Sequence, residues 1–458
     1  MLFFWLYLFC LIIIGEVCAR KRIKNLDDFL LAGRHHGILI SSGSLTATVI
    51  GAGSTIGAAG AAYYVGVSAA WYLLSACIGL FILAFTLAPA LRSMSLYTIP
   101  EFMGKRYGAR AKLLASFLSI IGLLLFLAAQ FYAIGAILHQ LTAIQIRLAI
   151  VLAAFLVIFY TLRGGAWAVH LSDNLQLVLI VLGVLLLCIF GLKEIWGQHT
   201  LDYPPLAKGF EDMGHHWFHP TLEKRVKAWD IFGLGTTILG WIIMSTTWHF
   251  TMQSTAQRFL STKDVKTAKI SCLISILLLL PIAFSVALVG MIARLIYPHL
   301  PPATGIAQGQ ALIVLVNTVL PDISGGLLLA ALVAIIMSTC DSALLGASTI
   351  FLKDIYPRVN IRLLTLCLGS MATTGAILWP RLIQLLEWTA AIYCIGLFAP
   401  LILGLYWKKA SEKSALAAMV LSGIIGGLWR ILEIEQMSGI HFLIPALIFS
   451  FIIMVIFK

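Results

Sequence analysis

Charged residues are scarce in this chain. They make up 11% of its 458 residues, whereas a soluble domain contains about 25%. Hydrophobic residues make up 61% and gather in long unbroken runs, such as Leu113 to Leu138. Runs of this kind exclude a soluble protein, and they exclude a β-barrel, whose strands alternate polar and apolar residues over segments of about ten. The composition therefore predicts an all-α protein that crosses a lipid bilayer many times.

No hydrophilic segment is long enough to form a soluble domain. The two largest loops, 194–228 and 294–322, are each about 30 residues long, so we expect one transporter domain over 1–458. The apolar runs predict about thirteen membrane spans, at 2–18, 38–66, 69–91, 113–139, 145–162, 174–192, 229–256, 267–293, 323–350, 361–379, 383–406, 414–431 and 440–457.

The net charge of +12 is not arranged as nucleic-acid binding requires. Lys and Arg cluster in short connectors, and no basic patch with interleaved aromatic residues is present, so we expect no nucleic-acid partner. The basic cluster Arg20 to Lys24 follows the first apolar run, which is the reverse of a signal peptide. With the N-terminus outside, 22 of the 31 Lys and Arg fall on the cytoplasmic side. This predicts a multi-pass protein of the cell (inner) membrane with a cytoplasmic C-terminus, and we expect a monomer.

Familiar catalytic and metal-binding motifs are also missing. The chain has no HExxH or GxSxG motif and no paired catalytic carboxylates, so an intramembrane enzyme is disfavoured. The eight cysteines all lie in or beside apolar runs and none lies in the two long loops. That placement argues against a disulfide framework, and no cysteine spacing suits zinc.

Against this apolar background, one span carries an unusual polar cluster. Ser338, Thr339, Asp341 and Ser342 stand within five consecutive residues of the span 323–350. Because hydrocarbon penalises unpaired polar groups by several kcal/mol each, ionisable residues at this depth indicate function. Ser338 and Thr339 share one helix face with the residue at 335, and hydroxyl oxygens suit a small hard cation.

The span 38–66 is interrupted by glycine. Gly51, Gly53, Gly57 and Gly60 stand mid-membrane among hydroxyl residues, and glycine frees the backbone to leave the helical region. This pattern predicts a broken helix whose carbonyls and half-helix ends can bind ions and substrate. The alternative is tight helix packing through small residues.

The span 229–256 has the same polar, glycine-containing character and is the fifth span after 38–66. The correspondence predicts an inverted repeat of two five-helix halves, 38–192 and 229–406. The segments 2–18 and 414–457 would then be peripheral helices.

Several connectors resemble the sodium:solute symporter family. The matching segments lie in the family's order and are Asn25 to Arg34, Tyr97 to Gly108, Arg163 to Gln176, Gln253 to Lys269, Ala331 to Leu345 and Gly404 to Lys409. Ser172 replaces the usual threonine in the third segment, and Ile335 replaces a residue that is usually small. The resemblance implies a LeuT-type fold with a 5+5 inverted repeat, sodium as the coupling ion and a small organic solute as substrate.

The resemblance also implies a sodium site between the first core helix and the eighth. Its ligands would be three backbone carbonyls and two hydroxyls, from Ala47, Ile50, Ile335, Ser338 and Thr339. The alternative for the two hydroxyls is ordinary bonding to carbonyls one turn earlier in the helix.

Two aspartates are expected on the path by which sodium leaves. Asp173 matches a family aspartate linked to sodium release toward the cytoplasm, and it could also cap the start of the sixth span. Asp341 stands near the same exit. It could instead help form a second cation site or serve only in structural hydrogen bonding.

The solute-binding residues are predicted on weaker grounds. Ser54, Ser245 and Trp248 align with substrate or gate positions of sugar-transporting members, while the others adjoin the break or are polar groups in apolar spans. The full set is Gly51, Ser54, Gln130, Ser245, Trp248, Gln253 and Glu387. The chain lacks the richer amide and charged set of the sugar members, which disfavours a sugar.

These observations predict a sodium-coupled symporter that imports an amino acid such as proline, or a monocarboxylate, by alternating access. Two alternatives stay open. One is a transport-like sensor that acts with a separate signalling partner. The other is a proton-coupled symporter of the same fold, with Asp173, Asp341 or His249 as the proton carrier.

Overall fold

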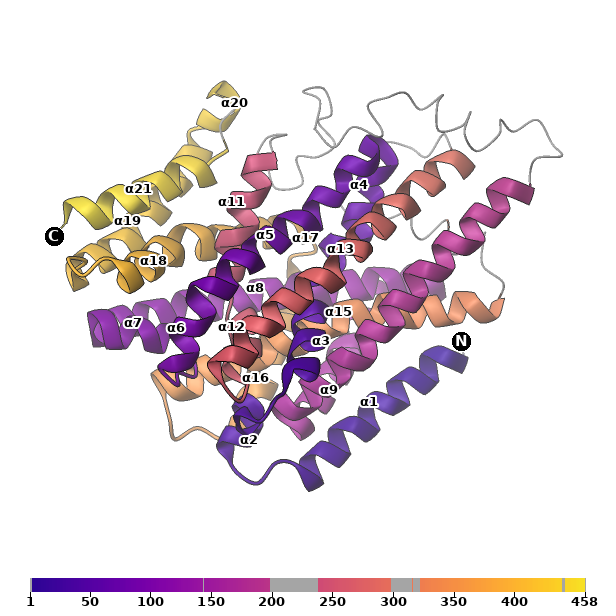
Figure 1. Ribbon diagram of the computed structural model, residues 1–458, viewed down its shortest axis with the longest axis horizontal. Coiled ribbons are helices and arrows are strands. Elements are labelled where there is room, and N and C mark those ends of the chain that lie inside the picture. Colours follow the sequence, from indigo (N-terminus) through magenta and orange to yellow (C-terminus); the bar gives the residue numbers. More distant parts are fainter. Residues whose placement is uncertain are drawn as a thin grey trace.

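The computed structural model describes residues 2–142, 144–197, 238–297, 315, 322–438 and 441–457. Regular structure in this part of the chain is almost entirely helical, as predicted (Figure 1). Its helices are α1 (Leu2–Lys21), α2 (Leu26–Leu31), α3 (Ile38–Val49), α4 (Ala58–Val65), α5 (Trp71–Phe85), α6 (Leu87–Ser93), α7 (Ile99–Tyr107), α8 (Ala109–Thr142), α9 (Ile146–Gly197), α11 (Ile238–Thr251), α12 (Gln253–Leu260), α13 (Val265–Ile296), α15 (Asp322–Ile350), α16 (Ile361–Leu378), α17 (Leu382–Ala390), α18 (Phe398–Tyr406), α19 (Glu412–Ile431), α20 (Ile434–Ser438) and α21 (Leu443–Ile456).

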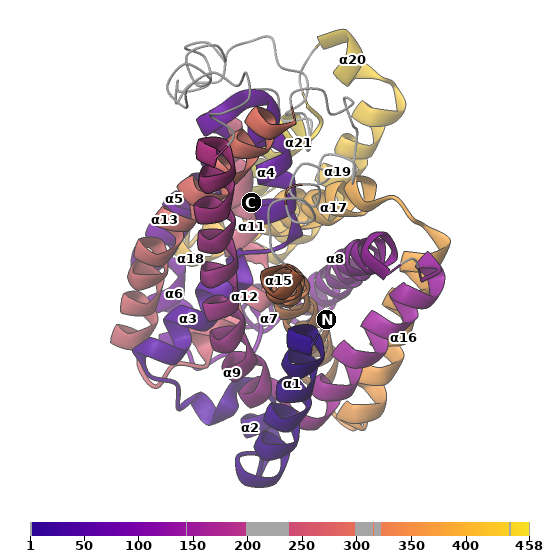
Figure 2. The same cartoon turned by 90° about the vertical axis from the view of Figure 1, so that its right-hand side faces the viewer.

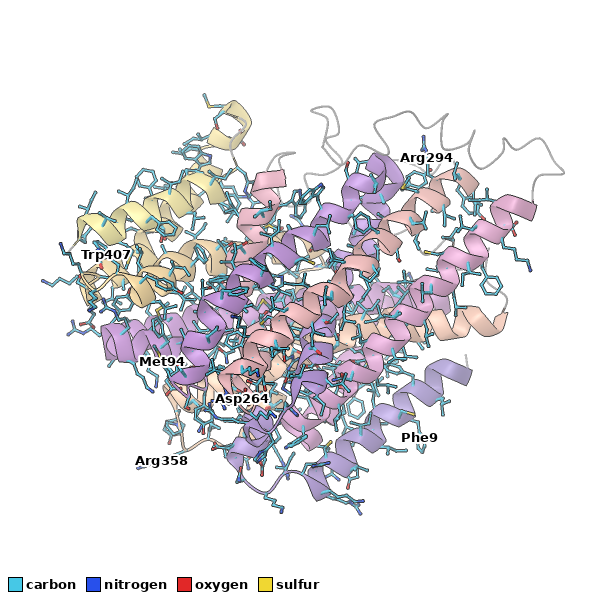
Figure 3. The ribbon with its side chains drawn as sticks, in the orientation of Figure 1. Phe9, Met94, Asp264, Arg294, Arg358 and Trp407 are labelled. Carbon is cyan, nitrogen blue, oxygen red and sulfur yellow. The ribbon has the colours of Figure 1, made fainter. Side chains whose placement is uncertain are left out.

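Eight helical segments in the described residues are long and apolar enough to cross a membrane. Large apolar side chains are exposed on α1 and on several of these segments, among them Phe9, Phe155 and Leu277, which suits contact with lipid. Figure 3 shows Phe9 pointing away from the molecule. The count of thirteen spans stays a prediction, because α3 and α21 are short and the segment 198–237 lies outside the described residues.

Helix α15 forms the centre of the molecule. It packs against α3, α8, α9, α12 and α16, and Figure 2 shows it nearly end-on with α1, α8, α9 and α12 around it. The span Ala330–Ile355 is buried along its most apolar window. The polar cluster that the sequence placed in an apolar helix therefore faces protein and not lipid, as the cost of desolvation requires.

Helix α9 is a hairpin of two arms. Gly165 interrupts its 52 residues with φ 47° and ψ −148°, and Figure 2 shows the two arms diverging. A straight helix of that length would extend about 78 Å, well over twice the hydrocarbon thickness of about 30 Å. A side chain at Gly165 would place its Cβ 2.6 Å from the carbonyl oxygen of Phe29. Glycine is therefore required there for both conformation and space.

Two membrane helices are broken by one or a few extended residues. Helix α3 ends at Val49, and Ile50 adopts φ −85° and ψ 104° before a π-helical turn over Gly53–Gly57 leads into α4. Helix α11 ends at Thr251, and Met252 adopts φ −76° and ψ 121° before α12 begins. Both breaks were expected from composition. The second lies at a methionine, so glycine content located the first break better than the second.

The connectors predicted to be cytoplasmic share one face of the molecule. Arg34 donates to the carbonyl of Ser95 at 2.8 Å, and Arg92 donates to the carbonyl of Thr262 at 2.8 Å. Lys112 pairs with Asp354 at 3.0 Å. Figure 3 shows Met94, Asp264, Arg358 and Trp407 along the lower left margin, and Arg294 on the opposite side. This agrees with the predicted alternation of connectors, while the side of the membrane that this face occupies stays a prediction.

Candidate functional site

The break in α3 faces the polar stretch of α15. In a continuous helix the amide of Gly51 would donate to the carbonyl of Ala47. Here it donates to Oγ of Ser54 at 2.8 Å, so the Ala47 carbonyl loses its usual helical partner. Oγ of Ser338 lies 3.5 Å from that carbonyl oxygen. The break therefore presents a freed carbonyl to a hydroxyl of the neighbouring helix.

Both hydroxyls of α15 converge at the same place. Ser338 Oγ lies 2.8 Å and Thr339 Oγ1 3.3 Å from the carbonyl oxygen of Ile335. This bonding to a carbonyl one turn earlier is the alternative to ion binding that the sequence left open. The same hydroxyls also lie close to α3, so the two arrangements coexist. Thr339 Oγ1 also lies against Gly51, 3.4 Å from where a Cβ there would stand. The five residues predicted for sodium, from Ala47 to Thr339, are all buried.

These oxygen atoms suit an alkali cation. The Ala47 and Ile335 carbonyls and the two neutral hydroxyls provide hard, uncharged donors, as a singly charged hard ion prefers. In the part of the chain that the structure describes, no group of three or more His, Cys, Asp or Glu side chains could hold a transition metal.

A buried charge network lies beside this site. Asp173 of α9 pairs with Arg258 of α12 at 2.9 Å and accepts from Ser44 of α3. Ser342 accepts a hydrogen bond from Arg258, and its Oγ lies 3.1 Å from a carboxylate oxygen of Asp341. All five of these side chains, Ser44 included, are almost wholly inaccessible to solvent.

The network also links to the candidate ion site and to α9. Ser342 donates to the carbonyl of Ser338 at 2.6 Å. Tyr160, in the first arm of α9, donates to Asp341. The alternative that Asp173 caps a helix is wrong, because Asp173 lies within the second arm of α9, eight residues beyond Gly165.

A cavity of about 90 Å³ adjoins the α3 break on the other side. Five of the predicted solute residues line it, namely Gly51, Ser54, Gln130, Ser245 and Trp248. Its aromatic walls include Tyr72 against Trp241, with ring centroids 5.2 Å apart, and Phe126 against Trp248 at 5.3 Å. Thr339 also lines the cavity, so one hydroxyl residue borders both the candidate ion site and this space.

The polar groups in the cavity wall differ in how they are used. Ser54 is engaged within the break, accepting from Gly51 and lying 3.1 Å from the Gly51 carbonyl. Among the described residues, Gln130 Oε1 and His249 Nδ1 have no hydrogen-bond partner although both atoms are buried. Buried polar atoms normally find a partner, so these two atoms are available to contact a solute.

Two predicted solute residues lie elsewhere. The side chain of Gln253 accepts from the amide of Ile99 at 3.0 Å and donates to the carbonyl of Tyr97 at 2.9 Å, which anchors the start of α7. Glu387 pairs with Arg430 at 2.7 Å near the surface. Neither residue lines the cavity.

Sequence reasoning missed other residues of the site. Tyr72 and Trp241 gave no signal, because aromatic residues are frequent in apolar spans. Arg258 could have been found by the same burial cost that singled out Asp341, since an unpaired charge is as costly in hydrocarbon.

Comparisons with known proteins identify the family of this chain. The profile of the sodium:solute symporter family matches residues 29–422. The sodium/pantothenate symporter of Escherichia coli (strain K12) is 27% identical over 97% of this chain and 93% of its own length. The sodium/proline symporter 2 of Staphylococcus saprophyticus is 25% identical over 98% and 90%. The sodium/glucose cotransporter 1 of Oryctolagus cuniculus is 26% identical over 91% and 69%.

Solved structures agree on the fold. A Na+-coupled sialic acid symporter in a substrate-bound, outward-open state superposes with a TM-score of 0.82 at 20% identity, over 99% of this chain and 95% of that one. A nucleobase-cation-symport-1 family transporter in a closed conformation gives 0.60 at 14% identity, over 94% and 95%. The fold is the LeuT type, and the coupling ion of the family is sodium. This multi-pass membrane chain belongs to the sodium:solute symporter family.

Proposed function

We propose that this chain imports a small organic solute, an amino acid such as proline or a monocarboxylate, together with sodium. The observation that carries the proposal is the position of Thr339, which borders both the candidate ion site and the cavity. An ion held there orders the wall against which the solute binds. Occupancy of one site therefore changes the affinity of the other, as symport requires.

Sodium binds between the α3 break and α15 in this proposal. Its ligands are the carbonyls of Ala47, Ile50 and Ile335 and the hydroxyls of Ser338 and Thr339. The freed Ala47 carbonyl and the convergence of both hydroxyls near it support this set. Binding favours the outward-open state, and the membrane potential adds about 2.3 kcal/mol per charge per 100 mV.

The solute occupies the cavity beside Gly51 and Ser54. Among the described residues, no Asp, Glu, Lys or Arg side chain lines it. A carboxylate there is neutralised most simply by the bound sodium and by backbone dipoles at the break. Gln130 and Ser245 supply polar contacts, and Trp248 closes over the solute. The aromatic walls and the few unpartnered polar atoms favour an amino acid or a monocarboxylate over a sugar.

Sodium leaves past Asp173 and Asp341. Two carboxylates and one guanidinium are buried together, so the network carries one negative charge in excess when both acids are ionised. Such a charge attracts a passing cation, and the two halves of the molecule then rock to open the inner side. Gln253 and Glu387 contribute indirectly in this scheme, through the anchoring of α7 and through the pair with Arg430.

Uptake of a panel of labelled amino acids and monocarboxylates into proteoliposomes tests the proposal. An inward sodium gradient should drive accumulation of at least one compound, and a proton gradient alone should not. Accumulation driven by protons without sodium, or no sodium-dependent uptake of any compound, would contradict it.

A further inference from the structure

Two buried histidines meet outside the site described above. The rings of His36 and His170 lie 4.4 Å apart between centroids, and the ring of His36 lies 4.7 Å from that of Trp167. Both histidine side chains are inaccessible to solvent. In the described part of the chain, none of their four ring nitrogens has a hydrogen-bond partner, and neither does Nε1 of Trp167.

Such an arrangement is not what apolar packing alone would select. A neutral imidazole carries one N–H donor and one acceptor, and leaving either unpaired in a buried place costs free energy. A leucine or phenylalanine would fill the same space without that cost. The unpaired nitrogens therefore point to a ligand, and a proton is the ligand that imidazole binds in the physiological range.

The pair lies where three segments beside the proposed release path meet. The amide of His36 donates to the carbonyl of Ser261 at 3.2 Å, and the amide of Lys263 donates to the carbonyl of His36 at 3.1 Å. These two bonds tie the segment before α3 to the connector between α12 and α13. His170 belongs to α9 and stands three residues before Asp173, which pairs with Arg258 of α12.

The charged groups around the pair oppose protonation of the two imidazoles while the three segments are packed together. They are Arg22 after α1, whose guanidinium lies 4.9 Å from the ring of Trp167; His35 beside His36; Lys263 in the connector; and Arg258, matched by Asp173. Burial, followed by Arg258, His35 and Arg22, lowers the pKa of His36 to about 3. In water the pKa of histidine is about 6.5.

Because the pKa of His36 is lower in the packed form than in water, the balance between the packed form and an open, hydrated form depends on pH. The packed form keeps His36 neutral, and a form that admits water lets it take up a proton near its ordinary pKa. The packed form is therefore fully favoured above about pH 6.5 and loses that advantage as the pH falls below it. A lower pH on the face that carries the predicted cytoplasmic connectors therefore shifts the protein from the packed form toward the open form.

We propose that His36 and His170 form a proton-binding latch on the inner gate, closed while both rings are neutral and released when water reaches and protonates them. The latch rests on the proposed release path past Asp173, but it does not depend on which solute is carried. Acidification of the predicted cytoplasmic side would then speed opening toward that side.

Hydrogen–deuterium exchange on the full-length protein in lipid nanodiscs tests the latch without any solute. Exchange is followed with sodium present at about pH 7.5 and about pH 5.5, with labelling times scaled for the intrinsic pH dependence. We expect the amides of His36 and Lys263 to exchange at least about threefold faster at the lower pH. Peptides from α16, which contains no histidine, should not change.

The double variant His36→Leu/His170→Leu should lose this pH response. The matched control is His441→Leu, which alters a buried histidine between α20 and α21, and it should retain the response. An unchanged exchange rate in the unmodified protein, or a response that survives in the double variant, would overturn the latch. If the double variant does not fold, the two single variants and the unmodified protein still decide. Failure of the latch leaves sodium-driven uptake untouched, so the two proposals fail separately.

Discussion

The two sides of the α3 break differ in the chemistry that they offer. Toward α15, the break presents a carbonyl freed from its helix and two hydroxyls, all within a few ångströms. Toward α5 and α8, it opens on aromatic rings and two unpartnered polar atoms, Gln130 Oε1 and His249 Nδ1. The first side suits a bare cation, and the second suits an organic molecule.

In the proposed function, a single break serves both partners of a symport cycle. A cation site needs only oxygen atoms at fixed spacing, which two helices in register can supply. A solute site needs a shaped space, which takes side chains from several helices. Thr339 touches both sides, so variants on either side should separate ion affinity from solute affinity.

The largest effect is expected on the cation side. Ser338→Ala removes one proposed ligand, and a hydrogen bond or ion contact to a charged group contributes about 1.5–3 kcal/mol. The sodium concentration for half-maximal uptake should therefore rise at least about tenfold. Sodium titration of uptake in proteoliposomes checks this.

Ser348→Ala is the matched control for that variant. Ser348 stands on the same helix and bonds to the carbonyl of Leu344 at 2.8 Å, but it lies away from the break. It should leave the sodium dependence unchanged. Equal sodium dependence in both variants would remove Ser338 from the site.

A comparable effect is expected on the solute side from Gly53→Val. A Cβ at Gly53 would stand 2.6 Å from the hydroxyl of Tyr72, so the larger side chain must push the cavity wall aside. The KM for solute should rise about tenfold or uptake should be lost, with sodium binding retained. Gly423→Val is the control, because nothing lies within 4 Å of a Cβ there. Unchanged solute KM in Gly53→Val would show that the solute binds elsewhere.

A smaller effect is expected from Gln130→Leu. This change removes the buried, unpartnered amide oxygen while preserving much of the side-chain volume. A lost neutral hydrogen bond of about 0.5–1.5 kcal/mol predicts a rise in solute KM of about two- to tenfold, without a change in sodium affinity. If solute KM stays constant, the solute makes no bond to this amide.

The smallest effect is expected from Glu387→Gln. The ion pair with Arg430 is partly exposed, with side-chain accessibilities of 42% for Arg430 and 16% for Glu387. Pairs of this kind contribute about 0–1 kcal/mol to stability. Solute KM should change less than about twofold, and thermal unfolding should shift only slightly. A large rise in KM would return Glu387 to the solute site.

The approach of the α15 hydroxyls to the α3 break was the more predictable arrangement from sequence. Polar residues stand out in an apolar helix because their burial is costly, and Gly51 marks the point at which Ala47 and Ile50 can release their carbonyls. The inverted repeat followed from the same reasoning, since polar, interrupted spans were expected at corresponding positions, and α3 and α11 are both broken.

The solute side was harder because burial cost reveals a polar residue but not its partner. Gln253 meets that cost by bonding to Tyr97 and Ile99, about 150 residues earlier in the chain. Glu387 meets it through Arg430. Tyr72 and Trp241 form cavity walls, but nothing distinguishes them in a sequence that is 11% aromatic. Which side chains share a cavity depends on the packing of several helices, and local patterns do not encode that.

The central claim is that sodium binds between the α3 break and the hydroxyls of α15. Direct binding of radioactive sodium to the purified full-length protein, without solute, tests it most simply. The unmodified protein and Ser348→Ala should bind sodium saturably with the same affinity, and Ser338→Ala and Thr339→Ala should each bind at least about tenfold more weakly. Equal sodium binding by all four proteins would contradict the claim.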